Sequence, residues 1–437
     1  MRRTRLALAT AALYTMLSPA VHADEATLQA EVDALHAEVA ALKDEVRQIH
    51  AERTQAVPTV ANRAAAAAPN AGSAPPAVAI AESSGTSLWG YGQIDYNRPT
   101  AQAAAAQADL SRAVIGFNHV FDEATRVYGE LEWEHAIASA DDRGETEVEQ
   151  LYVEHALASN VGVRAGLMLV PLGLLNEHHE PTQFYGVERN FVETAIIPST
   201  WREGGVAGYG STDSGLSWNI GIGTGPDLSK WNPASADGRE SPLGSIHQEL
   251  QLAKAHDLSV YGAANWQGIP GFTVGGGVFT GKIGQRTPGF SANNARLVLG
   301  EAHLRWQPGP FDFAALYTRG TISNTQALNA SFTDALTPVP KSFWGGYAQG
   351  AWRALEWNQS SLAPFLRYEM FNTGAAYAAQ PQGLGSPPRP TERVWTVGTN
   401  YYLNPNVVFK LDYQNFNRDD LALGYGHRFD LGIGYQF

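Results

Sequence analysis

The chain has 437 residues with no cysteine, 44 glycines, 17% charged residues and a formal net charge of −13. Its 44% hydrophobic share excludes global disorder, and the missing cysteines exclude a disulfide scaffold and a thiolate metal site. The acidic balance argues against binding of nucleic acid, and no apolar run beyond the N-terminus is long enough for a membrane-spanning helix.

Residues 1–23 have the features of a secretory signal peptide. Arginines within the first five residues precede a short apolar run, and Val21-His22-Ala23 offers a small-residue cleavage site. The alternative, a membrane anchor, fails because the apolar run is too short. An exported chain without cysteine fits a bacterial envelope protein that does not depend on disulfides.

Residues 24–53 carry a heptad pattern that predicts a coiled-coil oligomerisation helix in the periplasm. The alternative is a single amphipathic helix packed on its own domain, and the valine and leucine pattern nominally favours a dimer. The next segment, 54–87, is rich in alanine, proline and serine and is expected to be a linker. The apolar heptad residues are Leu28, Val32, Leu35, Val39, Leu42, Val46 and Ile49.

From residue 88 to 437 the apolar pattern repeats every two residues. In the last segment, Phe429 and Leu431 alternate with Arg428 and Asp430, and similar alternation recurs along the chain. Few helical stretches exist to cover either face of such strands. A transmembrane antiparallel β-barrel in the bacterial outer membrane, with lipid outside and water inside, accommodates both faces.

Short turns and long polar connections alternate along this region. Seven short and eight long connections predict sixteen strands, with the termini on the short-turn side. An 18-stranded barrel is the alternative if 225–255 hides a hairpin. The third long connection, 170–202, is the longest that clearly lacks a strand pattern, and loops of this length are usually functional.

Three blocks, 171–205, 268–276 and 401–437, resemble the phosphate-selective porin O/P family. The resemblance implies a trimeric, 16-stranded barrel preceded by a helical segment, whose third external loop narrows the pore. A trimer would make the heptad segment a three-stranded coiled coil. The chain's ending also resembles the signal read by the barrel-assembly machinery, carried here by Asp430, Gly432, Tyr435 and Phe437.

The chemistry of a pore depends on the charges along its wall and its narrow part. The candidate residues are those on the charged faces of predicted strands and those in the 170–202 connection. Each of them also has a simpler explanation, which is that it keeps the lumen wet or pairs with a neighbour. The candidates are Arg112, Arg126, Glu130, Glu132, Glu134, Arg164, Glu177, His178, His179, Glu180, Glu188, Arg189, Glu193, Arg202, Arg367, Lys410, Asp412 and Arg428.

The phosphate specificity of the family does not transfer directly. Its phosphate-specific members carry rows of Arg and Lys, whereas residues 88–437 hold 23 basic and 34 acidic residues here. The sequence therefore predicts a porin for small hydrophilic solutes or inorganic ions, with open selectivity. A phosphate- or anion-selective channel and a barrel with a structural, periplasmic tethering role are the alternatives.

No catalytic residues, cofactor or metal ion are expected. A barrel lipase is the enzymatic alternative, but no G-x-S-x-G motif is present. The segment Glu177-His178-His179-Glu180 offers metal-ligand atoms, yet adjacent side chains diverge and the H-E-x-x-H spacing is missing. The expected partners are outer-membrane lipid, two further copies of the chain in a homotrimer, the barrel-assembly machinery and the transported solutes.

Overall fold

The computed structural model describes residues 85–139, 142–333, 337–378, 391–417 and 426–437. The predicted signal peptide, the coiled coil and nearly all of the predicted linker lie outside these residues. None of the helices in the described ranges is long and apolar enough to cross a membrane.

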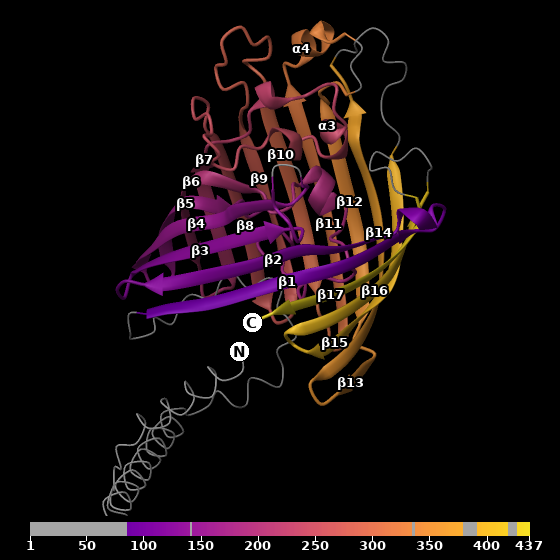
Figure 1. Ribbon diagram of the computed structural model, residues 1–437. Coiled ribbons are helices and arrows are strands. Elements are labelled where there is room, and N and C mark those ends of the chain that lie inside the picture. The colour runs from indigo at the N-terminus through magenta and orange to yellow at the C-terminus, as the bar shows by residue number, and fades with distance from the viewer. Residues whose placement is uncertain (1–84, 140–141, 334–336, 379–390, 418–425) are drawn as a thin grey trace, which may run out of the picture. The chain divides into compact units, whose positions relative to one another are not determined.

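Sixteen long antiparallel strands form one closed barrel, because β1 pairs with both β2 and the last strand, β17 (Figure 1). A short extra strand, β13 (Leu355–Trp357), forms a hairpin with β14. The wall strands are β1 (Gly85–Pro99), β2 (Gln107–Val120), β3 (Thr125–Glu134), β4 (Glu145–Ala158), β5 (Val161–Leu169), β6 (Arg202–Ser211), β7 (Leu216–Gly223), β8 (Ser259–Ile269), β9 (Phe272–Lys282), β10 (Arg296–Trp306), β11 (Phe311–Ser323), β12 (Ser342–Trp352), β14 (Ser360–Ala376), β15 (Glu392–Asn404), β16 (Val407–Phe416) and β17 (Arg428–Gln436).

The predicted sixteen-stranded barrel is confirmed. The connection 225–255 contains short helical turns and no strand, so the 18-stranded alternative is wrong. The elements α3 and α4 belong to long connections at one end of the barrel, whereas β13 belongs to a short one at the other end (Figure 1). The helical elements are η1 (Ala103–Ala105), η2 (Val192–Ile196), η3 (Leu228–Lys230), α3 (Asp237–Glu240), η4 (Gly244–Ile246) and α4 (Gln326–Ser331).

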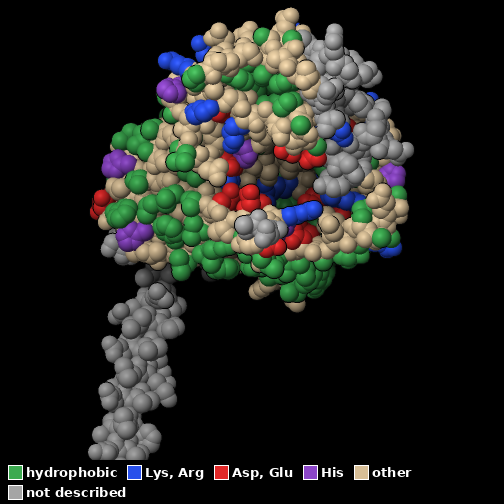
Figure 2. Space-filling view, turned by 45° about the horizontal axis from the view of Figure 1, so that its top comes forward, with side chains coloured by type: hydrophobic (Ala, Val, Ile, Leu, Met, Phe, Trp, Pro, Cys, Tyr) green, Lys and Arg blue, Asp and Glu red, His purple; other side chains and the backbone are tan. Residues whose placement is uncertain are grey.

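The alternation of residues places apolar side chains outside and polar side chains inside. Phe429 and Leu431 are exposed on the outer surface, while Arg428 and Asp430 are buried on the inner one. An outward apolar surface suits lipid, because lipid tails offer no hydrogen bonds. Figure 2 shows acidic and basic side chains gathered in a hollow at the end of the long connections.

Part of the inner wall is apolar, which the two-residue pattern did not predict. Leu297, Leu299, Phe343 and Phe371 point inward on β10, β12 and β14 and are fully buried. They belong to one apolar cluster inside the barrel, to which the loop between β5 and β6 contributes Val192 and Ile196 and the connection between β7 and β8 contributes Leu228 and Ile246. Burial of such apolar side chains stabilises the loop in this place.

Candidate functional site: the loop inside the barrel

Residues 170–201, called the inner loop, connect β5 to β6 and lie within the barrel. Its backbone N–H groups at Val187 and Phe191 donate to the wall carboxylates of Asp412 (2.6 Å) and Glu369 (2.6 Å). The loop also contacts β1 and β4 through His179, and β9 through Trp201. Because β9 lies across the closed barrel from β1, the loop spans the lumen.

The apolar end of the inner loop fixes it to the wall. Val192 and Ile196, in the π-helical turn η2, and the neighbouring Trp201 are buried in the apolar cluster of the inner wall. The ring of Trp201 lies 4.4 Å from that of Phe279 on β9, centroid to centroid. This packing holds the inner loop inside the barrel. Without it, the loop could extend into water, which would hydrogen-bond its backbone.

One buried carboxylate organises the loop internally. Glu193 accepts hydrogen bonds from the backbone N–H groups of Leu174 (2.5 Å) and Leu175 (2.8 Å). It also accepts from the Asn190 amide (2.8 Å) and from the hydroxyl of Tyr347 on β12 (2.8 Å). Glu193, one of the predicted pore residues, thus joins the two ends of the loop to each other and to the wall.

Two cavities lie on either side of the inner loop. The short-turn cavity, about 380 Å³, is lined by turn residues such as Asp122 and Asn160 and by Glu177 and His178 of the loop. The long-connection cavity, about 910 Å³, is lined by rim residues such as Gln102 and by Glu188 of the loop. The inner loop contributes different residues to each cavity and stands between them.

The predicted site residues fall into three groups. Arg126, Arg164, Glu177 and His178 line the short-turn cavity, and Arg112, Glu188, Arg189 and Arg428 line the long-connection cavity. The others line neither cavity and are buried or partly buried in the barrel wall or against the inner loop. These others are Glu130, Glu132, Glu134, His179, Glu180, Glu193, Arg202, Arg367, Lys410 and Asp412.

The arginines of the wall lie beside carboxylates. Arg367 and Arg428 contact carboxylates two residues farther along the same strand, in both cases with 2.9 Å between Nε and a carboxylate oxygen. Glu154 contacts both Arg126 and Arg164. Eight carboxylates and five arginines line the two cavities. The inner surface therefore carries more acidic than basic groups.

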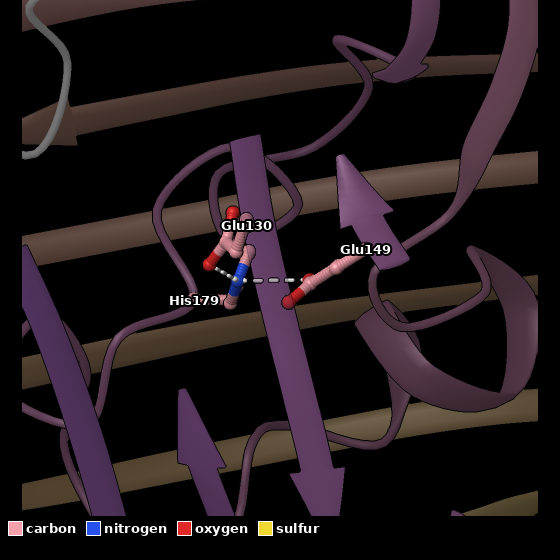
Figure 3. Close-up of side chains that lie close together, drawn as sticks. All are labelled: Glu130, Glu149 and His179. Carbon is pink, nitrogen blue, oxygen red and sulfur yellow. Dashed lines mark ion pairs between the residues drawn. The ribbon is translucent and has the colours of Figure 1, made fainter. Parts of the chain in front are cut away.

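Glu130, Glu149 and His179 form a buried cluster between β3, β4 and the inner loop (Figure 3). His179 Nε2 lies 3.0 Å from Glu149 Oε1 and 3.9 Å from Glu130 Oε1. Tyr91 Oη lies 2.8 Å from His179 Nε2 and donates to Glu130 at 3.0 Å. Imidazole and carboxylate atoms in this arrangement can hold either a proton or a metal ion.

The surroundings of His179 favour its charged form. Burial by itself lowers the pKa of this imidazole, but the charge of Glu149 and contacts with Glu130 and Glu149 outweigh burial and raise the pKa to about 10. Without a bound metal ion, His179 is therefore an imidazolium at neutral pH. It fixes the inner loop to β3 and β4 through a charged contact.

Sequence reasoning missed Glu149 of this cluster and also Tyr91, which contacts it. Glu149 is the extra residue of a β-bulge, because Glu130 pairs with Gln150 and Leu131 pairs with Val148. Tyr91 fits an aromatic girdle by its position in the sequence, yet only 1% of it is exposed. Two consecutive polar residues, Glu149 and Gln150, were the available signal that the alternation is broken there.

Comparison with known proteins identifies the fold. No model of a known protein family matches the sequence. An uncharacterized protein of Aquifex aeolicus (strain VF5) is 29% identical over 339 residues, which is 75% of each chain. Salmonella typhi OmpF, solved in complex with daunomycin, matches with a TM-score of 0.57 and 16% identity over 80% of this chain and 97% of its own.

A second solved structure gives the same result. The outer-membrane channel DcaP of Acinetobacter baumannii has a TM-score of 0.52 and 14% identity, over 82% of this chain and 100% of its own. These likenesses show that the chain has a porin-type barrel fold. The narrower resemblance to the phosphate-selective porin O/P family stays a prediction.

Proposed function

We propose that this chain forms a water-filled channel in a bacterial outer membrane, through which small hydrophilic solutes and ions diffuse passively. The observation that carries the proposal is the pair of cavities separated by the inner loop inside a closed barrel. The outward apolar faces and the porin-type fold support the location. In this proposal the inner loop is the constriction.

The test is a conductance measurement on the purified full-length protein in planar bilayers. We expect stepwise current increases, in groups of three if the chain assembles as the homotrimer implied by the family resemblance. Deleting residues 24–87 should disturb the groups of three and leave the unit step unchanged. A correctly folded barrel that never conducts would contradict the channel proposal.

Selectivity for cations follows from the charges on the inner surface. Because carboxylates outnumber arginines in the lining of the two cavities, the lumen attracts cations and repels anions. Arg428, which lines the long-connection cavity, lies beside the carboxylate of Asp430. We therefore favour a cation-preferring channel over the phosphate- or anion-selective alternative.

The reversal potential in a KCl gradient tests this preference. We expect the sign of the reversal potential to show a preference for potassium over chloride. We also expect that phosphate does not block the chloride current. Arg428→Gln should increase the cation preference, because it removes a positive charge from the lining of the long-connection cavity. An anion preference, or block by phosphate, would favour the alternative. Arg393→Gln on β15, which lines neither cavity, is the control.

The role in assembly and the structural alternative rest on the two ends of the chain. Gly432 lies close to Asp95 and Val187 inside the barrel, while Tyr435 and Phe437 are exposed outside. Exposed aromatic residues on the last strand are accessible to the barrel-assembly machinery, as proposed for this signal. A tethering function for residues 24–87 in the periplasm is compatible with the channel and stays a proposal.

A further inference from the structure

The cluster around His179 brings four potential ligand atoms together from distant parts of the chain. They are Tyr91 Oη on β1, a carboxylate oxygen each of Glu130 on β3 and Glu149 on β4, and His179 Nε2 on the inner loop. The imidazole and carboxylate ligand atoms lie within 4.8 Å of one another. Figure 3 shows both carboxylates directed toward the imidazole.

Two carboxylate oxygens at this position are buried and accept no well-aligned hydrogen bond. They are Glu132 Oε1 and Glu149 Oε1, and the latter lies 3.0 Å from His179 Nε2, whose proton a metal ion would displace. Glu132 is partly compensated by Arg112, whose Nη1 is 3.5 Å away, but that contact is too long for a hydrogen bond. Buried anionic oxygen without a donor is unfavourable, and a bound cation would satisfy it.

The orientation of the ligands is already set by groups around them. His179 Nδ1 lies 2.9 Å from the backbone oxygen of Asn176 and donates to it, which leaves Nε2 directed at the carboxylates. The Gln150 amide donates to Glu130 Oε2 at 2.6 Å, and the bulge turns Glu149 inward. Hydrogen bonds of this kind to ligating histidines and carboxylates are typical of metal sites in proteins.

We propose that Glu130, Glu149 and His179 bind one divalent transition-metal ion of the zinc type, with Tyr91 or water as a further ligand. One imidazole and two carboxylates suit Zn²⁺, whereas Ca²⁺ requires six to eight oxygen ligands. This site differs from the sequence-based expectation of no metal ion. His178 lines the short-turn cavity instead, so adjacent residues do diverge, and the other two ligands come from the wall.

Such an ion would connect the inner loop to the wall between β3 and β4. The proposal does not depend on the channel function. A non-conducting barrel can still bind zinc, and a conducting barrel can lack the site.

Equilibrium dialysis of the full-length protein in detergent against ZnCl₂, followed by elemental analysis, tests the site. We expect one zinc ion per chain in the wild type, unaffected by excess CaCl₂. Glu149→Gln and His179→Gln should weaken binding at least about tenfold. His178→Gln is the matched control and should bind as the wild type does. Heat-dependent mobility on SDS gels reports whether each barrel is folded.

Several results would overturn the proposal. They are absence of zinc binding by the wild type, equal binding by the folded His179→Gln variant, and displacement of zinc by calcium. X-ray absorption at the zinc edge of the wild-type protein needs no variant. We expect one imidazole nitrogen with oxygen ligands, and a shell of oxygen alone would also exclude the site.

Discussion

Replacing residues 174–198 with a short glycine-serine linker is expected to raise the unit conductance of the channel severalfold. The inner loop separates the two cavities, so its removal joins them into one wider passage. The ends of the loop lie together already, because the Val170 N–H donates to the Trp201 oxygen at 2.8 Å. A short linker can therefore close the gap without moving β5 or β6.

Single-channel recording is the measurement, with heat-dependent gel mobility as the test of folding. The control shortens the exposed β9–β10 connection at Pro288 and Gly289, which line neither cavity, and should leave the unit conductance nearly unchanged. A folded variant without the inner loop that conducts like the wild type would show that this loop is not the constriction.

Glu193→Ala is expected to loosen the inner loop while the barrel stays intact. The substitution leaves the N–H groups of Leu174 and Leu175, the Asn190 amide and the Tyr347 hydroxyl without their common acceptor. Each orphaned buried donor costs about 1–3 kcal/mol, so the loop loses several kcal/mol of local stability. The wall retains its strand pairing, because Glu193 lies outside every strand.

Current noise and hydrogen exchange detect this change. We expect larger fluctuations in the open-channel current and faster exchange of the Leu174 and Leu175 amides than in the wild type. Glu177→Ala is the matched control, because Glu177 is on the same loop with its side chain exposed to the short-turn cavity. Wild-type exchange rates at both amides would contradict the assigned role of Glu193.

The barrel could be predicted because the residue patterns that define its strands and turns lie within short stretches of sequence. A period of two residues is visible within a single strand, and turn residues mark its ends, so sixteen strands and their inward faces follow from short windows. Arg428 and Asp430 are inside for this reason. Glu149 was missed because a β-bulge at this position shifts the two-residue period of β4 by one residue.

The arrangement of the inner loop was not predictable from local patterns. The Val187 N–H donates to Asp412, which lies 225 positions farther along the sequence. The apolar part of the inner wall also looked like ordinary alternation, since Leu297 and Leu299 resemble lipid-facing residues in sequence. Which face the loop covers depends on the tertiary structure, and the strand sequences alone do not encode it.

The anchoring of the inner loop on late strands sets an order of events during folding. Phe191 and Val187 donate to Glu369 and Asp412, which lie 178 and 225 residues farther along the sequence. Contacts across such sequence separations form slowly. The loop can therefore be fixed at these two positions only once β14 and β16 have joined the barrel. Substitutions in the wall near Glu369 will consequently reduce the yield of assembled barrel before they change the open channel.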